Sequence, residues 1–298
     1  MHLFNQMWKI KTDFIKSMKI VKSTTALEKE ISKSKSAGKS IGFVPTMGAL
    51  HAGHSSLVER AKAENDFCVV SIFVNPTQFN NKTDLEKYPR NLESDALLLE
   101  KIGCDLIFAP ESKDIYSQEE ITDSFQFDFG GLDQVMEGKF RPGHFNGVVQ
   151  IVSKLFSLVK PDKAYFGEKD FQQLAIIHRM VDVLNFKVEI IDCPIVRETD
   201  GLAMSSRNER LSTTDRKIAV SISKVLFESR NFATRFSPTE LTDWVVSEVN
   251  TVQGLVVEYF EIVDAVSLEK IQDWSKPSVG CIAVFCGEVR LIDNIRYL

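Results

Sequence analysis

The sequence predicts an α/β fold in which a doubly wound parallel sheet is followed by a smaller α+β unit. Three observations support this prediction. Continuous apolar runs, of the kind found in strands buried on both faces, occur in the first two thirds of the chain. They alternate with stretches of helical periodicity, as in a parallel sheet covered by helices on both sides. From residue 213 onwards the pattern changes to two helices followed by three strands.

The elements of the larger unit can be assigned in order. The first is a solvated amphipathic helix at residues 24–36, in which Leu27 and Ile31 are apolar and Gly38 is the expected C-cap. Strands are predicted at residues 41–44, 67–74, 104–109, 163–166 and 187–191. Helices between them are predicted to end at residue 62 and to span residues 92–102, 148–159 and 176–184.

The smaller unit follows a boundary at Cys193-Pro194. We therefore expect one domain at residues 18–195 and a second at residues 196–298. Helices of the second domain are predicted at residues 215–230 and 238–251, and strands at residues 256–263, 281–285 and 288–292.

Composition excludes several classes of protein. Of the 298 residues, 44% are hydrophobic, which is ordinary for a globular protein with a substantial core. The 36 basic and 41 acidic residues leave a net charge of −5, which argues against binding to nucleic acid or to a membrane surface. No apolar stretch approaches the roughly 20 residues of a membrane span, and the N-terminus does not resemble a signal peptide. Five scattered cysteines fit buried thiols in a reducing cytosol, so we expect a cytoplasmic protein.

The most informative stretch is residues 41–62, where a buried strand turns into a helix. Gly48, His51, Gly53 and His54 crowd this turn. The glycines allow close approach of a ligand, and the first amides of a helix attract anionic oxygens. Two imidazoles on the same turn can hydrogen-bond a phosphate whose charge changes during a reaction. The turn therefore predicts a nucleotide site; a zinc pair is the less favoured alternative, because no third ligand lies close by in the sequence.

Polar residues follow two other predicted strands. Asn75 and Gln78 come after the second strand, and Gly167, Lys169 and Asp170 come after the fourth. Because the carboxyl ends of parallel strands share one edge of the sheet, we expect these residues to lie near the histidines. Glycine and lysine at a strand-to-helix junction suit a phosphate. A solvated helix start capped by Asp170 is an equally good interpretation of that segment alone.

Two loops supply further polar groups. Residues 137–145 carry two cations, a histidine and two glycines, and residues 196–208 carry hydroxyls and Arg207. These loops provide local positive charge in an otherwise acidic chain.

Six blocks of the sequence, in order, resemble those of the pantothenate synthetase family, the pantoate–β-alanine ligases: PTMGALHAGH, SIFVNPTQF, YPR, RPGHFNGV, FGEKDFQQL and DGLAMSSRN. The resemblance covers residues 18–298 and leaves residues 1–17 as an N-terminal extension. It implies membership of the HxGH nucleotidyltransferase superfamily, with a Rossmann-like first domain and a C-terminal lid. The MSSRN block is similar to the KMSKS loop of class I aminoacyl-tRNA synthetases.

The resemblance also implies an activity and its residues. Members of the family join pantoate to β-alanine with ATP and Mg²⁺ through a pantoyl adenylate, and they are typically cytoplasmic homodimers. The residues expected to bind ATP are Met47, Gly48, Ala49, Leu50, His51, Ala52, Gly53, His54, Gly167, Glu168, Lys169, Asp170, Val196, Met204, Ser205, Ser206 and Arg207. The expected catalytic residues are His51, His54, Lys169 and Arg207, and the expected substrate-binding residues are Asn75, Gln78, Arg141 and Gln173.

Further details of the site follow from the same resemblance. Pro45, Met47 and Phe73 are expected to contact the geminal methyl groups of pantoate. The resemblance makes His54 the proton donor. On physical grounds we expect both histidines to act as hydrogen-bond donors instead, since adenylation needs no obligatory proton transfer to pyrophosphate. No ligand set for magnesium follows from the sequence.

Two other functions share part of this pattern. A nucleotidyltransferase acting on a phosphorylated small molecule would also use H-x-G-H, but the paired glutamines favour an uncharged contact with pantoate over a phosphate clamp. A non-catalytic nucleotide sensor is the third possibility, and the intact His51, His54, Lys169 and Arg207 argue against it.

Overall fold

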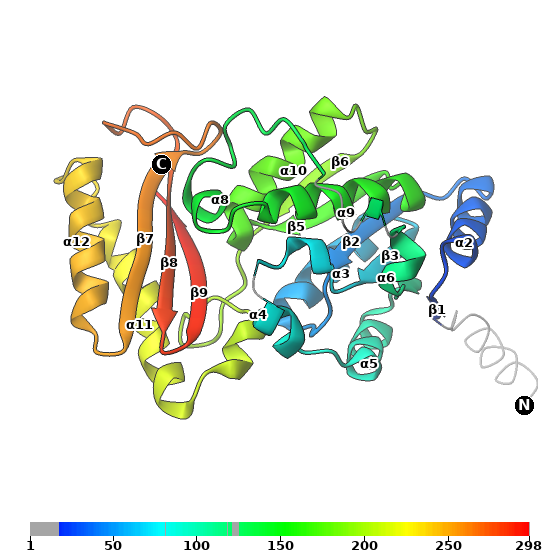
Figure 1. Ribbon diagram of the computed structural model, residues 1–298, viewed down its shortest axis with the longest axis horizontal. Helices are drawn as coiled ribbons and strands as arrows, with labels where there is room; N and C mark the ends of the chain where they lie inside the picture. Colours follow the sequence, from blue (N-terminus) through cyan, green and yellow to red (C-terminus); the bar gives the residue numbers. More distant parts are fainter. Residues whose placement is uncertain (1–17, 81, 118, 121–124, 298) are drawn as a thin grey trace, which may run out of the picture.

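The structure is a computed structural model that describes residues 18–80, 82–117, 119–120 and 125–297. The expected N-terminal extension and five residues of the stretch at 115–129 lie outside the described residues. Figure 1 shows a parallel sheet flanked by helices on the right and an antiparallel sheet with two helices on the left. The fold class predicted from the sequence is confirmed. None of the helices in the described part of the chain is long and apolar enough to cross a membrane.

Six strands form the parallel sheet. They are β1 (Lys19–Val21), β2 (Ile41–Thr46), β3 (Phe67–Ile72), β4 (Leu106–Phe108), β5 (Lys163–Gly167) and β6 (Glu189–Cys193). Their order across the sheet is β1-β4-β3-β2-β5-β6, and every neighbouring pair is parallel.

Helices cover both faces of this sheet because successive strand residues point to opposite sides. Phe43 of β2 and Phe166 of β5 face a core shared with helices on one side. Val44 and Tyr165, their neighbours in the chain, face the other side. The first side holds α2 (Thr24–Ser36), α9 (His144–Val159) and α10 (Phe171–Val183), and the second holds α3 (Ala52–Glu64) and α5 (Leu92–Ile102). Burial on both faces explains the continuous apolar runs in the sequence.

The strand order reverses at β2. From β2 the chain continues through β3 and β4 towards one edge, and β5 later pairs with the other side of β2. In open α/β sheets, ligands bind at the carboxyl ends of the strands at such a switch point. The segments that follow Thr46 and Gly167 therefore meet where a site is expected.

The second unit is an antiparallel sheet with two helices on one face. Its strands are β7 (Leu255–Asp264), β8 (Ser278–Cys286) and β9 (Val289–Arg296), in that order. The helices α11 (Thr213–Ser229) and α12 (Pro238–Thr251) share an apolar core with this sheet. Tyr259 and Cys281, on the other face, pack against Met136 and Phe171 of the first unit. The expected domain limits at residues 195 and 196 stay a prediction.

A buried ion pair joins the two units. Glu137 of α8 (Met136–Phe140) accepts hydrogen bonds from Arg290 of β9 at 2.6 and 2.9 Å and from the Tyr259 hydroxyl at 2.9 Å. Burial alone would raise the pKa of Glu137, but the hydrogen bonds and charge of Arg290 outweigh it and hold that pKa at about 2. The pair is therefore charged at neutral pH.

Several elements differ from the sequence prediction. β1 was not expected, because three residues at the edge of a sheet, two of them exposed, carry no apolar run. α9 begins at His144 and not at residue 148, and α10 begins at Phe171 and not at residue 176. Their first turns contain polar residues that interrupt the apolar pattern. The expected loop at 137–145 contains the short helix α8.

Candidate active site

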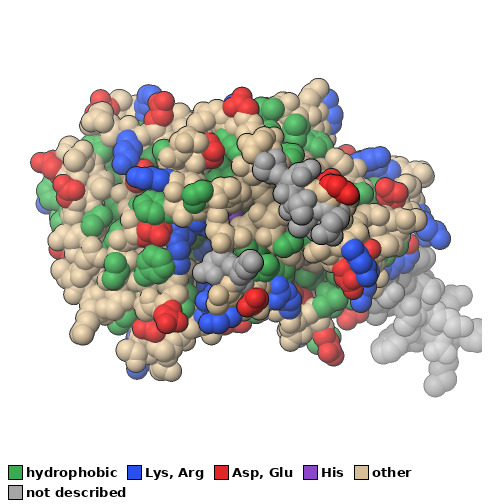
Figure 2. All heavy atoms as spheres, in the orientation of Figure 1, with side chains coloured by type: hydrophobic (Ala, Val, Ile, Leu, Met, Phe, Trp, Pro, Cys, Tyr) green, Lys and Arg blue, Asp and Glu red, His purple; other side chains and the backbone are tan. Residues whose placement is uncertain are grey.

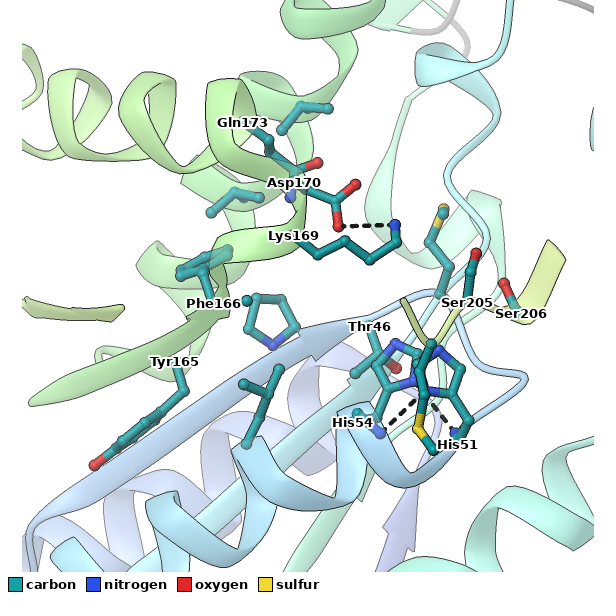
Figure 3. A pocket seen from close by; sticks show the side chains of 18 of the residues that line it. Thr46, His51, His54, Tyr165, Phe166, Lys169, Asp170, Gln173, Ser205 and Ser206 are labelled. Atoms are coloured by element: carbon teal, nitrogen blue, oxygen red, sulfur yellow. Dashed lines mark hydrogen bonds and ion pairs between the residues drawn. The ribbon is translucent and has the colours of Figure 1, made fainter. Parts of the chain in front are cut away.

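A cleft lies at the carboxyl ends of β2 and β5, between the two units. The turn after β2, the segment after β5 and a loop of the second unit line it. Figure 2 shows a hollow near the middle of the molecule with Lys and Arg side chains around it. In Figure 3, His51 and His54 lie on one wall, and Lys169 and Asp170 lie on the other.

The turn after β2 is held by a carboxylate from α5. Gly48 and Ala49 both have left-handed backbone, with φ of 82° and 52°. Asp95 accepts hydrogen bonds from the amides of Ala49 at 3.0 Å and Leu50 at 2.8 Å. A Cβ at position 48 would lie 2.9 Å from Asp95 Oδ2, so both the space and the backbone angle require glycine there. Burial raises the pKa of Asp95 despite these two bonds. Asp95 thus fixes the turn that leads to His51.

Backbone contacts set the tautomers of the two histidines. His51 Nδ1 accepts a hydrogen bond from the Gly53 amide at 3.1 Å, and His54 Nδ1 accepts one from the His51 amide at 3.3 Å. In a neutral imidazole the accepting nitrogen carries no proton, so each ring is protonated at Nε2. A Cβ at position 53 would lie 2.9 Å from His51 Cε1, which explains the glycine in H-x-G-H. Both rings therefore offer an N–H donor at Nε2.

Both imidazoles are neutral at physiological pH. Burial, followed by the charge of Lys169, lowers the pKa of His51 to about 4. Burial, followed by the neighbouring His51 and Lys169, lowers the pKa of His54 to about 3. Neutral rings with a proton on Nε2 are suited to donate hydrogen bonds, and a charged general acid is disfavoured.

The segment after β5 brings a cation to the opposite wall. Lys169 in η2 (Glu168–Asp170) has its Nζ 3.7 Å from Asp170 Oδ2, and its side chain is 17% exposed. Asn294 of β9 donates hydrogen bonds to the carbonyl oxygens of Glu168 at 2.8 Å and Lys169 at 3.0 Å. The second unit thereby holds the segment that carries the lysine.

Polar and apolar groups expected to bind the organic substrate lie along the same cleft. Asn75 and Gln78, beside η1 (Pro76–Gln78), and Gln173 of α10 line it. The predicted apolar contacts also line it: Pro45, Met47 and Phe73. A hydroxy acid with an apolar backbone would find both kinds of partner here.

The loop of the second unit is tied to the first unit by Tyr88 and Asp84, to which the sequence had assigned no role. The hydroxyl oxygens of Ser206, in η3 (Ser206–Arg210), and Tyr88 lie 3.3 Å apart. Arg207 donates a hydrogen bond to Asp84 at 3.2 Å, and Arg210 donates one to the same carboxylate at 2.7 Å. Asp84 belongs to α4 (Lys82–Lys87). These contacts hold the loop over the first unit.

The cleft brings together most of the predicted site residues. Those that line it are Met47, His51, Gly53, His54, Asn75, Gln78, Gly167, Lys169, Asp170, Gln173, Val196, Met204, Ser205, Ser206 and Arg207. The other predicted residues, all within the described chain, are absent from its lining: Gly48, Ala49, Leu50, Ala52, Arg141 and Glu168. Arg141 lies in an adjoining cavity and pairs with Glu137 at 3.2 Å. Glu168 pairs with Arg296 at 2.8 Å.

The amides of the turn are engaged within the protein. Gly48 N donates to Thr46 Oγ1 at 3.2 Å, and the amides at positions 49 and 50 donate to Asp95. The amides of His51 and Gly53 donate to imidazole nitrogens. Of these five, only the Gly53 amide belongs to the first turn of α3, so the prediction that the first amides of the helix bind anionic oxygens stays a prediction.

The residues that sequence analysis missed had little local signal. Asp95 and Asp84 are carboxylates on helices, where a solvated charge is the ordinary interpretation. Tyr88 belongs to the YPR block, so the resemblance marked its position without assigning a contact. Only the folded chain brings these three residues to the turn and the loop.

No group of three His, Cys, Asp or Glu side chains in the described part of the chain could hold a metal ion. Asp170 is the one carboxylate among the described residues that line the cleft. The arrangement combines neutral N–H donors, hydroxyls and the cations Lys169 and Arg207 around one space. Such a set can bind a polyphosphate and stabilise charge that develops at phosphorus.

Comparison with known protein families gives a single assignment. The pantoate-beta-alanine ligase family matches residues 19–296. A pantothenate synthetase from Phocaeicola vulgatus is 58% identical over 283 residues, which cover 94% of this chain and 99% of that protein. A pantothenate synthetase from Porphyromonas gingivalis is 54% identical over 282 residues, with the same coverage.

Solved structures of similar sequence share the fold. Pantothenate synthetase from Thermus thermophilus is 42% identical, with a TM-score of 0.88 over 94% of this chain and 99% of that chain. A pantoate-beta-alanine ligase from Francisella tularensis, complexed with beta-gamma ATP and beta-alanine, is 37% identical, with a TM-score of 0.78 over 94% and 98% of the two chains.

Proposed function

The chain belongs to the family of pantoate-beta-alanine ligases and joins pantoate to β-alanine with ATP, and we propose that the reaction proceeds through a pantoyl adenylate. The carboxylate of pantoate attacks the α-phosphorus of ATP and displaces pyrophosphate. The neutral amine of β-alanine then attacks the acyl carbon, AMP leaves, and the amine proton passes to solvent. Activation by a nucleotide is needed because a free carboxylate is a poor acyl donor.

One observation carries this proposal: two neutral imidazoles with Nε2–H donors line the same cleft as Lys169 and Arg207. Adenylation moves negative charge onto phosphate oxygens, and fixed donors aimed at those oxygens lower the barrier. His51 and His54 act as such donors, and the two cations bind the triphosphate. Ser205 and Ser206 add hydroxyl donors from the second unit.

The remaining lining residues divide between the two substrates. Val196 contacts the adenine of ATP, and Met204 closes over the triphosphate with the residues that follow it. Gln78 and Gln173 bind the polar groups of pantoate, and Pro45, Met47 and Phe73 contact its geminal methyls. The Francisella tularensis ligase is complexed with beta-gamma ATP and beta-alanine, which supports ATP and β-alanine as ligands of this chain.

Magnesium fits the same site. Mg²⁺ is usually held by one or two carboxylates together with substrate phosphates, and Asp170 lines the cleft with its side chain 49% exposed. We assign Asp170 as the protein group nearest the ion. When bound, the ion neutralises charge on the triphosphate.

We also propose that the protein is a cytoplasmic homodimer, as the family resemblance implies. Light scattering coupled to size-exclusion chromatography tests the dimer: a mass near twice 33.7 kDa supports it, and a mass near 33.7 kDa contradicts it.

The decisive experiment for the reaction is a product analysis. AMP and pyrophosphate should form only when ATP, magnesium and pantoate are all present, and β-alanine should accelerate turnover. Formation of ADP and phosphate would place the attack at another phosphorus. Nucleotide binding without turnover would instead support a nucleotide sensor.

A further inference from the structure

The amide of Gln78 can face the cleft with either of two atoms. Its carbonyl oxygen would accept a hydrogen bond from a substrate, whereas its NH2 group would donate one. Gln78 is 9% exposed and lines the cleft. Which atom faces the substrate has to be inferred from the surrounding hydrogen bonds.

Asn75, next to Gln78, has no capacity left for a substrate. Its Nδ2 donates to Gln78 Oε1 at 3.1 Å and to the carbonyl oxygen of Gly147 at 3.0 Å. Its Oδ1 accepts from the hydroxyls of Tyr116 at 2.9 Å and Thr77 at 3.1 Å. An asparagine amide has two N–H groups and two carbonyl lone pairs, and these four bonds use all of them. Asn75 is also only 1% exposed.

The Gly147 carbonyl makes the orientation of Asn75 unambiguous. A carbonyl can only accept, so the Asn75 atom that faces it must be the nitrogen. The chain passes so close to α9 at this point that position 147 requires glycine, because a Cβ there would lie 2.6 Å from the backbone nitrogen of Gln78. The other amide atom of Asn75 is then the oxygen, and Tyr116 must donate to it.

The orientation of Asn75 determines that of Gln78. Since the second N–H of Asn75 points to Gln78, the Gln78 atom that receives it is the oxygen. Gln78 Nε2 then lies towards Met47, with Sδ at 3.1 Å. The backbone of Gln78 is held as well, because its carbonyl oxygen accepts a hydrogen bond from His144 Nδ1 at 2.8 Å.

We propose that Tyr116 is a positioning residue for the ligase reaction, which holds the Gln78 amide, through Asn75, with its NH2 group towards the substrate. The proposal rests on the proposed binding of pantoate beside Gln78. The thioether sulfur of Met47 is a weak acceptor. When the hydroxy acid binds, one of its carboxylate or hydroxyl oxygens accepts a stronger hydrogen bond from Gln78 Nε2. Gln78 thereby presents a donor to an acceptor oxygen of the hydroxy acid.

A double-mutant cycle tests this relay. KM for pantoate, KM for ATP and kcat are measured for the wild type, Tyr116→Phe, Gln78→Met and the double variant. Tyr297→Phe is the control, because it also removes a tyrosine hydroxyl that contacts a side chain, 2.8 Å from that of Ser229, and Tyr297 is absent from the cleft lining. Thermal unfolding of each variant is recorded alongside.

Tyr116→Phe should raise KM for pantoate about fivefold, the size expected for one net hydrogen bond, and leave KM for ATP unchanged. In the Gln78→Met background the same change should have no further effect, because the group it positions is gone. An unchanged KM for pantoate, or an equal rise in both backgrounds, overturns the proposal. If Tyr116→Phe fails to fold, Thr77→Val removes the other hydroxyl donor to Asn75 Oδ1 and is interpreted in the same way.

Different results would contradict the proposed function and the proposed role of Tyr116. Absence of pantoate-dependent AMP formation by the wild type contradicts the proposed function. Normal AMP formation together with independent effects in the cycle contradicts the relay alone.

Discussion

The role of His54 can be tested by replacing each of its ring nitrogens separately. In Asn the amide reaches the position of Nδ1, and in Gln it reaches the position of Nε2. His54→Asn keeps an acceptor for the His51 amide but removes the donor that faces the cleft. His54→Gln keeps a donor near the position of Nε2, and a Gln at this third helical position can also reach back to the His51 amide.

The expected magnitudes follow from these contacts. Loss of a donor to developing charge at phosphorus should lower the rate of adenylation about 10²- to 10³-fold in His54→Asn. His54→Gln should stay within about 1 kcal/mol of the wild type in unfolding free energy, with less than about a tenfold loss of rate. Because burial lowers the pKa of His54 to about 3, the ring is neutral at pH 7 and carries a single proton.

Adenylation is followed by pantoate-dependent exchange of labelled pyrophosphate into ATP, and stability by urea unfolding. His178→Asn is the control. His178 belongs to α10, is absent from the cleft lining and pairs with Asp192 of β6 at 2.8 Å. Nitrogen-15 NMR should show both H-x-G-H rings neutral and protonated at Nε2 down to pH 5. Wild-type exchange by His54→Asn, or a charged His54 ring at pH 6, would refute the reasoning.

Two further predictions concern groups that hold the site in place. Asp95→Ala should lower the unfolding free energy by roughly 2–4 kcal/mol and raise KM for ATP, because two amides lose a charged acceptor; unchanged values in urea unfolding and steady-state assays would contradict it. Asp66→Ala, which also removes an acceptor of two hydrogen bonds but at the opposite end of the sheet, should leave KM for ATP unchanged. Glu137 has its pKa lowered from 4.5 to about 2 on folding, so its contribution is complete above pH 4.5 and is lost as pH falls towards 2. Between pH 7 and 3.5 the wild type should lose roughly 1 kcal/mol that Glu137→Gln does not lose, and parallel pH dependence of the two proteins in urea unfolding would exclude this role.

The sequence was sufficient for the order and type of most elements because each depends on neighbours in the chain. Buried strands appear as unbroken apolar runs, and helices as apolar residues at three- and four-residue spacing. β1 escaped detection since an edge strand of three residues has no such run. The H-x-G-H pair and the rim residues Gln78 and Lys169 were likewise visible, because they follow strands directly.

The contacts between distant parts of the chain were decided by the tertiary structure alone. The pairing of β2 with β5 places the histidines opposite Lys169, although more than 100 residues separate them. Asp95 reaches the turn from α5, and Tyr116 donates a hydrogen bond to Asn75, which donates one to Gln78. No local pattern marks such partners, because a carboxylate or hydroxyl has the same sequence signature whether it is solvated or buried against an amide. The direction of each hydrogen bond, and hence which nitrogen of a histidine carries the proton, follows from that three-dimensional surrounding alone.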